Sequence, residues 1–353
     1  MKKLSNTLLL TRMSILLIYT GGTIGMSRNS LSGALEPLDF AHLLRHIPEL
    51  HEVAADIHTT QFEPPIDSSD VTPSQWESLA RTIAGRYHDY DGFVILHGTD
   101  TMAYTASALS YMLGNLTKPV IFTGSQLPIG QLRTDGKENL ITAVSIAAAR
   151  DDEGRPLVPE VAIYFGGRLL RGNRTTKQSA EAFRAFASFN YPALADAGVD
   201  ITYHRDLILR PDYGRGLQPF YALDPNVIII SLFPGMRGDI LQHILQTPGL
   251  KAVVMRTFGS GNAPRHPWLL SALREAADRG LVIVNISQCV QGAVEMSRYD
   301  CGLHLQEAGV LSGLDSTVES AVTKLMHLLA RYSGDTAAVR SLMTKNLRGE
   351  ISV

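Results

Sequence analysis

Cysteine is scarce in this sequence, which contains only Cys289 and Cys301 among 353 residues. Two cysteines cannot build the disulfide framework that is typical of small secreted proteins, so we expect a reducing compartment, the cytoplasm. Long apolar runs are missing as well, since no stretch approaches the roughly 18 consecutive apolar residues that a membrane-spanning helix needs. The sequence therefore predicts no membrane association.

We also expect no signal peptide, although the first residues imitate one. Lys2 and Lys3 precede an apolar stretch at 8–10, but Arg12 interrupts that stretch. No cleavage site of the small-x-small type follows it. We interpret residues 1–12 as an extension, with Met1 or Met13 as the natural start.

The chain has no surplus of positive charge. Lys and Arg number 32 against 34 Asp and Glu, so the net charge is −2. Proteins that bind nucleic acid by bulk electrostatics usually carry a basic surplus, so the sequence predicts no nucleic-acid partner. Apolar residues make up 45% of the chain, which is enough for a substantial core. At about 150 residues per domain, the length predicts two domains.

Short apolar runs alternate with amphipathic stretches, which is typical of parallel β-sheets covered by helices on both faces. We therefore predict an α/β fold with a doubly wound, parallel-type sheet. The expected strands are 15–19, 92–96, 120–123, 161–165, 227–233, 252–256 and 281–286. The expected helices are 73–87, 101–113, 138–149, 239–246, 268–279, 315–330 and 336–346.

The alternation breaks between residues 206 and 224. Pro211, Gly214, Gly216 and Pro219 interrupt the pattern there, as in a linker. We predict a larger N-terminal α/β domain at 13–205, a linker at 206–224 and a smaller C-terminal α/β domain at 225–353.

Ligands of open parallel sheets bind beyond the carboxyl ends of the strands, so the residues that follow each strand are candidates for a site. The first run, 19–25, reads Tyr-Thr-Gly-Gly-Thr-Ile-Gly and presents Thr23 just after a strand. A plain tight turn is the alternative. A dinucleotide loop fits less well, because the spacing is not GxGxxG and no acidic residue follows on a second strand.

Two further runs carry hydroxyl and carboxylate groups. After the strand at 92–96, Thr99 and Asp100 precede Thr101, which is able to cap the next helix alone and so leaves both free to face a ligand. Residues 66–70 precede a helix that Thr72 caps, so Asp67, Ser68 and Ser69 are surplus to local structure. The alternatives are an ordinary helix cap and a solvated loop.

The run 168–177 contains four cations, among them Lys177. Taken alone, it is most simply a solvated face. A phosphate or nucleic-acid patch and an acid–base lysine are the functional alternatives. The sequence has no P-loop and no GxSxG nucleophile elbow. It also lacks zinc-ligand spacing among its His and Cys residues, so we expect no metal.

Taken together, these runs resemble the motifs of the L-asparaginase family. The resemblance rests on 19–25 and on His-Gly-Thr-Asp-Thr-Met-Ala-Tyr-Thr-Ala at 97–106. It extends to Asp-Ser-Ser-Asp at 67–70, Thr-Gly-Ser-Gln at 123–126, Arg-Gly-Asn-Arg-Thr-Thr-Lys at 171–177, Gly-Asn-Ala-Pro at 261–264 and Asn-Leu-Arg-Gly-Glu at 346–350. The type I, cytoplasmic branch is the most similar. This resemblance implies hydrolysis of asparagine to aspartate and ammonia, no cofactor, and a homotetramer built as a dimer of dimers.

The resemblance also implies roles for individual residues. Thr23 would be the nucleophile. Thr99, Asp100 and Lys177 would form a second catalytic group, with Asp100 also near the substrate's α-amino group. Asp67, Ser68 and Ser69 would hold the α-substituents. One departure is visible. The family commonly places a tyrosine on the loop after the nucleophile, whereas residues 26–37 contain none, Ala34 follows the loop glycine, and Tyr19 is no obvious substitute.

A regulatory asparagine site is a further implication, since bacterial type I asparaginases can carry one. Its matching positions here are Thr176, Arg256, Thr257, Phe258 and Cys289. If 175–177 is extended, Thr176 and Lys177 face opposite sides. The alternative is that Arg256 is an ordinary interface residue and Cys289 an apolar filler.

Two rival functions stay open. One is the asparaginase-like subunit of a tRNA-dependent amidotransferase, which passes ammonia to a partner. Such subunits carry an additional N-terminal domain, whereas only 18 residues precede the first motif here. The other is a catalytically weak amino-acid-binding regulator.

Overall fold

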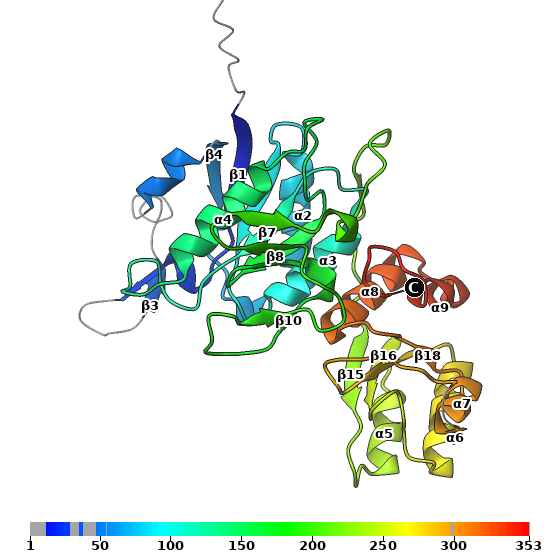
Figure 1. Cartoon of the computed structure of the whole chain (residues 1–353). Helices are drawn as coiled ribbons and strands as arrows, with labels where there is room; N and C mark the ends of the chain where they lie inside the picture. The colour runs from blue at the N-terminus through cyan, green and yellow to red at the C-terminus, as the bar shows by residue number, and fades with distance from the viewer. Residues whose placement is uncertain (1–11, 29–34, 38–46, 54, 298–299, 353) are drawn as a thin grey trace, which may run out of the picture.

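The computed structural model describes residues 12–28, 35–37, 47–53, 55–297 and 300–352 (Figure 1). The predicted extension at 1–11 and the loop position Ala34 lie outside these ranges. Within them, every helix is too short or too polar to cross a bilayer.

The N-terminal part of the chain is built on an eight-stranded sheet with the order β13-β12-β9-β8-β7-β5-β1-β4. Strands β4, β1, β5, β7 and β8 are parallel to one another, and β9, β12 and β13 continue the sheet in antiparallel fashion. The strands are β1 (Met13–Tyr19), β4 (Ala55–Gln61), β5 (Gly92–Leu96), β7 (Val120–Thr123), β8 (Val161–Phe165), β9 (Arg168–Arg171), β12 (Ala195–Ala197) and β13 (Ile201–Tyr203).

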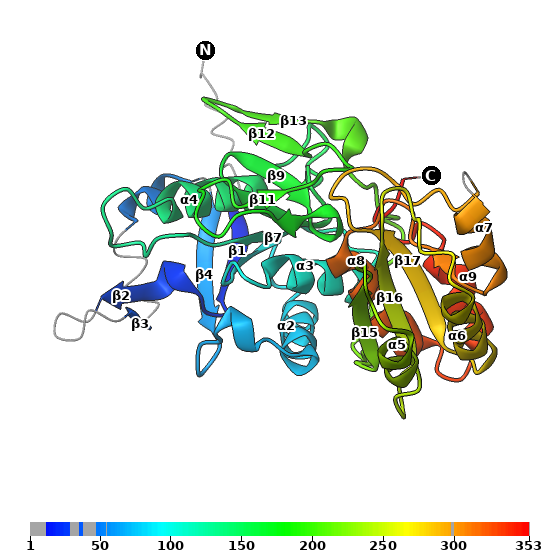
Figure 2. The same ribbon diagram turned by 90° about the horizontal axis from the view of Figure 1, so that it is seen from below.

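Helices cover both faces of this sheet (Figure 2). In β1, Ile15 and Leu17 join one core with α4 (Gly136–Ala148), whereas Leu16 and Ile18 join the opposite core with α2 (Pro73–Gly85) and α3 (Met102–Met112). Burial on both faces explains why this strand is a continuous apolar run rather than an alternating one.

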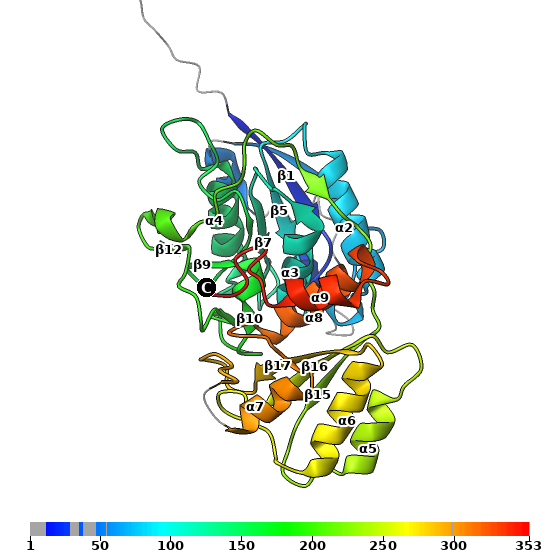
Figure 3. The same ribbon diagram turned by 90° about the vertical axis from the view of Figure 1, so that its right-hand side faces the viewer.

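The C-terminal part contains a parallel four-stranded sheet of β15 (Val227–Ser231), β16 (Ala252–Thr257), β17 (Val282–Ser287) and β18 (Leu311–Ser312). Helices α5 (Gly238–Leu245), α6 (Pro267–Asp278) and α7 (Asp300–Glu307) lie on one side, and α8 (Val318–Arg331) and α9 (Thr336–Met343) on the other. Helix α8 also packs against α3, so it lies between the two sheets (Figure 3).

The remaining elements are short. They are the strands β2 (Met26–Arg28), β3 (Leu35–Pro37), β6 (Leu113–Gly114), β10 (Thr176–Lys177), β11 (Phe186–Ala187) and β14 (Gln218–Pro219), and the 3₁₀ turns η1 (Thr23–Gly25), η2 (Pro48–Glu52), η3 (Ser68–Asp70), η4 (Gly172–Arg174) and η5 (Arg205–Leu207).

The predicted fold class is confirmed, with a larger and a smaller sheet. The seven expected strands and seven expected helices are all present, with ends displaced by at most three residues. The sequence missed β4, whose alternating polar residues mark an exposed edge strand. It also missed α7 and the antiparallel strands beyond β8. The segment 206–224 includes β14, which pairs with β6 of the N-terminal part, and we keep this segment as the proposed linker between the proposed domains.

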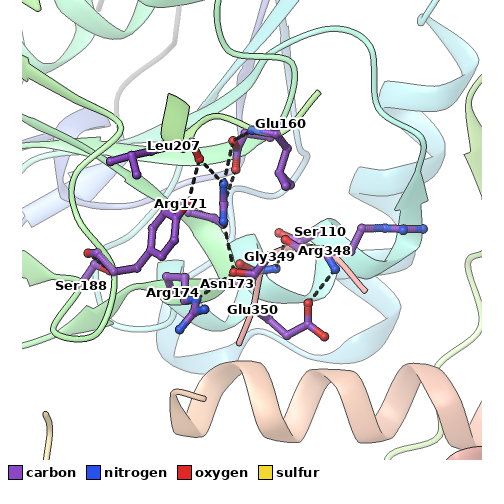
Figure 4. Close-up of polar contacts among 12 residues, drawn as sticks. Ser110, Glu160, Arg171, Asn173, Arg174, Ser188, Leu207, Arg348, Gly349 and Glu350 are labelled. Atoms are coloured by element: carbon purple, nitrogen blue, oxygen red, sulfur yellow. Dashed lines mark hydrogen bonds and ion pairs between the residues drawn. The ribbon is translucent and has the colours of Figure 1, made fainter. Parts of the chain in front are cut away.

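The run 168–177 is not a solvated face, so that prediction is wrong for its two central arginines. Arg171 is 3% exposed and pairs with Glu160 at 2.7 Å, and Arg174 is 2% exposed and pairs with Asp315 at 2.8 Å. Both guanidinium groups also donate to the carbonyl of Gly349 in the C-terminal segment, at 3.2 and 2.7 Å (Figure 4). The sequence could not reveal this burial, because Asp315 and Gly349 are 141 and 175 residues away from Arg174 along the chain and Glu160 precedes a different strand.

We expect Arg174→Met to lower the free energy of unfolding by about 3–5 kcal/mol, because it leaves Asp315 buried without its cation. Burial alone would raise the pKa of Asp315, but hydrogen bonds from Ser352 and Arg174 lower it overall. A carboxylate with a lowered pKa stabilises the fold at neutral pH, and this stabilisation is lost as the pH falls through the lowered pKa. Acid sensitivity should therefore shrink in the variant.

Urea unfolding at several pH values measures both effects. The control is Arg237→Met, which breaks an exposed ion pair with Asp239 and should leave stability nearly unchanged. Equal urea midpoints for the two variants would contradict the role given to Arg174.

Candidate active site

Three chain segments meet at the carboxyl ends of β1 and β5. The backbone N–H of Thr20 donates to the Leu96 carbonyl at 2.9 Å, and the N–H of Ile66 donates to the Thr20 carbonyl at 2.7 Å. The turn 19–25, the loop 66–70 and the turn 97–101 thus share one edge of the sheet, as expected for a ligand site in an open parallel sheet.

Glycine makes this meeting possible. At Gly22 the backbone has φ +99°, and an added Cβ would lie 2.5 Å from the backbone N of Gly98. An added Cβ at Gly98 would in turn collide with the Ser68 hydroxyl, and one at Gly21 with the Ile66 carbonyl. A side chain at any of these three positions would push the segments apart.

Thr23 opens the turn η1 directly after Gly22 and is partly exposed. Tyr19 lies behind this turn, with its ring against Gly25 and its hydroxyl donating a long hydrogen bond of 3.5 Å to the Gly22 carbonyl. Burial raises the pKa of Tyr19 to about 12, so the phenol stays protonated at neutral pH. Tyr19 therefore supports the turn and is not suited to be a base.

Asp67 is not surplus to local structure, contrary to the prediction. Its Oδ1 accepts hydrogen bonds from the backbone N–H and the hydroxyl of Ser69, both at 2.9 Å, and so caps the turn η3. The backbone bond, with the hydroxyl bond, lowers the pKa of Asp67. Thr101 also departs from its predicted role, because its hydroxyl donates to the Ser68 carbonyl at 2.6 Å rather than capping α3.

The structure brings Lys177 together with Thr99 and Asp100. Lys177 lies in β10, which pairs with β11, and its Nζ donates to Thr99 Oγ1 at 2.9 Å and to Asp100 Oδ1 at 2.6 Å. The Thr99 hydroxyl donates in turn to Gln126 Oε1 at 3.4 Å. The Asp100 side chain is 62% exposed, so the cluster opens to solvent. Gln126 belongs to the 123–126 run, but nothing in the sequence alone gave it a contact with Thr99.

Comparison with known proteins identifies the family of this chain. The family model described as Asparaginase, N-terminal matches residues 14–209, and the model of the Glutaminase/Asparaginase C-terminal domain matches residues 226–343. The chain belongs to the asparaginase family. L-asparaginase 1 of Escherichia coli K12 is 46% identical over 347 residues, covering 96% of this chain and 98% of that protein.

Two further proteins are similar to this chain, a solved L-asparaginase structure and an amidotransferase subunit. The crystal structure of L-asparaginase I from Vibrio cholerae has a TM-score of 0.87 and 40% identity, covering 97% of this chain and all of that one. A glutamyl-tRNA(Gln) amidotransferase subunit of Thermococcus kodakarensis is 31% identical over 96% of this chain, but the match covers only 76% of that amidotransferase protein.

A pocket lies on the side of β10 that faces away from Lys177. Thr176, Arg256 and Cys289 line it together with residues 314–319. The Thr176 hydroxyl donates to Glu319 Oε1 at 2.6 Å, so Thr176 and Lys177 do face opposite sides. The buried Nε of Arg256 has no hydrogen-bond partner within the described part of the chain.

Two of the predicted regulatory residues do not line this pocket. Thr257 is fully buried and its hydroxyl donates to Asn285 at 2.7 Å, and Phe258 packs against the core around α6. Cys289 is exposed rather than an apolar filler. Glu319, which the sequence analysis missed, takes a central place, and burial raises its pKa. Across the described ranges, no group of three or more His, Cys, Asp or Glu is placed to hold a metal.

We expect Gly22→Ala to destabilise the fold by more than about 1 kcal/mol, because alanine is strained at φ +99° and its Cβ meets the Gly98 backbone. The control is Gly85→Ala at the end of α2, where an added Cβ meets no atom within 4 Å. That change should be neutral or stabilising by up to about 1 kcal/mol. Thermal unfolding of both variants measures the difference, and equal stabilities would refute the close approach.

Proposed function

We propose that this protein is an L-asparaginase, which hydrolyses L-asparagine to L-aspartate and ammonia. The observation that carries the proposal is the Lys177–Thr99–Asp100 cluster, at the same sheet edge as the glycine turn that presents Thr23. The 46% identity to L-asparaginase 1 over nearly the whole chain supports the same substrate.

The reaction proceeds in two steps, with Thr23 as nucleophile. The Thr23 oxygen adds to the side-chain carbonyl of asparagine and the C–N bond breaks, so that ammonia leaves with the hydroxyl proton and an aspartyl ester remains. Water then hydrolyses this ester to aspartate and restores the hydroxyl. Division into two steps is the usual answer to a poor electrophile such as a carboxamide. Backbone N–H groups at the turns are suited to stabilise the oxyanion.

Proton transfer is assigned to the cluster of Lys177, Thr99 and Asp100. Lys177 is hydrogen-bonded to both Thr99 and Asp100, so a proton can pass along the cluster without large movement of any side chain. A hydrogen-bonded chain of this kind is what an acid–base role requires, since reacting groups must lie within about 2.6–3.2 Å of their partners.

Substrate binding is assigned to the loop 66–70 and to Asp100. Asp67 is charged at neutral pH like other aspartates, and its hydrogen bonds with Ser69 lower its pKa further. A carboxylate attracts the α-ammonium group of an amino acid. Asp100 supplies a second carboxylate for that group. The hydroxyls of Ser68 and Ser69 are the proposed partners of the α-carboxylate.

We further propose a cytoplasmic homotetramer, a dimer of dimers, with no cofactor and no nucleic-acid partner. The burial of Arg171 and Arg174 argues against the basic-patch alternative for 168–177. The amidotransferase alternative is less favoured, because this chain matches nearly the full length of L-asparaginase 1 but only 76% of the amidotransferase protein. The cluster around Lys177 argues against a catalytically weak regulator.

We expect Thr23→Ala to lower kcat by several powers of ten, about 10³-fold or more, because the nucleophile is lost. Folding should be nearly unaffected, since the Thr23 side chain is partly exposed. Ammonia release from asparagine, with glutamine in parallel, is the measurement, and Thr23→Ser is the control that keeps a hydroxyl. A Thr23→Ala variant with a tenth of the parental rate would remove Thr23 from the mechanism.

The pocket around Arg256 is proposed as a regulatory asparagine site. Its guanidinium has unused donor capacity for a carboxylate, and Thr176 is covalently next to Lys177. An occupant that competes with Glu319 for the Thr176 hydroxyl would shift β10 and with it Lys177. Couplings of this kind are typically about 1–3 kcal/mol. Thr257 and Phe258, which the resemblance also implies, remain proposals as residues behind the pocket.

This regulatory site predicts a sigmoidal dependence of rate on asparagine concentration. Arg256→Ala and Thr176→Ala should each make the curve hyperbolic, because the effector loses its contacts while the active site stays intact. Steady-state rates and the number of asparagines bound per chain are the measurements. A hyperbolic curve for the unmodified enzyme with one asparagine bound per chain would dispose of the site.

A further inference from the structure

A chain of hydrogen bonds leads from the core to the turn that carries Thr99 and Asp100. Trp76 Nε1 of α2 lies 2.9 Å from the Thr105 hydroxyl of α3. That hydroxyl lies 3.0 Å from Nε2 of His97, and Nδ1 of His97 lies 2.7 Å from the Gly98 carbonyl oxygen. The catalytic roles proposed above make no use of Trp76, Thr105 or His97.

Two of the three bonds in this chain have only one possible direction, and the protonation state of His97 sets the third. The Gly98 carbonyl can only accept, so Nδ1 of His97 carries the proton. Trp76 Nε1 can only donate, so the Thr105 oxygen accepts from it. If the imidazole is neutral, Nε2 is an acceptor and the Thr105 hydroxyl must donate to it. The order is therefore Trp76 to Thr105, Thr105 to His97, and His97 to the carbonyl of Gly98.

The surroundings keep His97 neutral. Its side chain is 4% exposed, and the ring of Phe122 stands edge-on to the imidazole with centroids 6.0 Å apart. Desolvation lowers the pKa of His97 to about 4. Its two ring nitrogens contact a carbonyl and a hydroxyl, neither of which carries charge, so the direction of the chain holds at neutral pH.

The end of this chain lies where the active-site segments meet. Gly98 is the residue whose backbone approaches Gly22, beside Thr23, and it directly precedes Thr99. The peptide plane of Gly98 therefore decides where the Thr99 hydroxyl stands relative to Lys177. We propose that His97 is a positioning residue, which fixes the Gly98 carbonyl through its Nδ1–H and thereby holds Thr99 and Asp100 in register with Thr23. This inference rests on the proposed asparaginase function.

Without the Nδ1–H donor, the buried Gly98 carbonyl would lose its partner and the turn would be free to rotate. Leaving a buried acceptor unpaired is costly enough to change the conformation of a short turn. Catalytic groups that work together tolerate little displacement, and an error of about 1 Å can slow a reaction about 100-fold. These hydrogen bonds thus use the contact of α2 with α3 to hold the turn that carries Thr99 and Asp100.

Two amide substitutions separate the two ends of the imidazole. In His97→Asn the amide nitrogen can take the place of Nδ1 and still donate to the Gly98 carbonyl. In His97→Gln the amide reaches the place of Nε2 and meets Thr105, but no donor faces Gly98. We expect kcat of His97→Asn to stay within about 3-fold of the parent, and kcat of His97→Gln to fall about 10- to 100-fold, as for one lost buried hydrogen bond.

The matched control is His88→Gln, an exposed histidine at the end of the segment after α2, which should keep the parental kcat. Rates are compared per folded enzyme, with the fraction folded taken from thermal unfolding of each variant. The proposal is overturned if folded His97→Gln retains the parental kcat, or if His97→Asn loses as much activity as His97→Gln.

A second measurement does not depend on activity. In ¹⁵N-labelled protein, His97 should show a protonated Nδ1 and an unprotonated Nε2, unchanged between about pH 5.5 and 8, which lies above the lowered pKa. The opposite tautomer, or titration in that interval, would overturn the inference. An unmodified enzyme that releases no ammonia would instead overturn the proposed function and leave this tautomer test standing.

Discussion

The close approach of Gly22 to Gly98 is the constraint on which the site depends. Two strands of a parallel sheet end side by side about 4.8 Å apart, and side chains normally keep the turns beyond them separate. Here glycines at 21, 22 and 98 let three turns come into backbone contact. The groups they carry, Thr23, Ser68 and Thr99, are thereby gathered at one edge of the sheet. Because this close approach depends on glycine, any residue with a side chain at these positions would disrupt it.

A second constraint acts from the other end of the chain. Lys177 lies on the two-residue strand β10, which pairs with β11, and its Nζ contacts Thr99. Its position is set three residues earlier, where Arg174 is held by Asp315 and by the carbonyl of Gly349. The C-terminal segment is therefore part of the support for Lys177. Helix α8, packed on α3, joins the same support to the core (Figure 3).

Much of this arrangement was readable in the sequence, because strands buried on both faces are continuous apolar runs and the motifs follow them directly. The cluster of Lys177 with Thr99 and Asp100 followed from the resemblance. What failed was whatever depends on partners distant along the chain. Arg171 and Arg174 were predicted to be solvated, because nothing in the neighbouring sequence shows that Glu160 and Asp315 pair with them. The contacts of Gln126 and Glu319 likewise have no signature in the neighbouring sequence. Strand β4 was not predicted because it lies at the edge of the sheet, beside β1, and so carries polar, exposed residues instead of a continuous apolar run.

The ionisable groups behind the active-site turns differ in burial and charge from those in front of the turns. Tyr19 and His97 are buried, and desolvation moves the pKa of the phenol up to about 12 and that of the imidazole down to about 4. Between these values both side chains are neutral. Asp67 and Asp100 are exposed to solvent, whereas the side chain of Lys177 is only 18% exposed and is paired with Asp100. Within the described part of the chain, these three charged groups are the ones that the proposed site offers to an amino-acid substrate, which itself carries an ammonium and a carboxylate group.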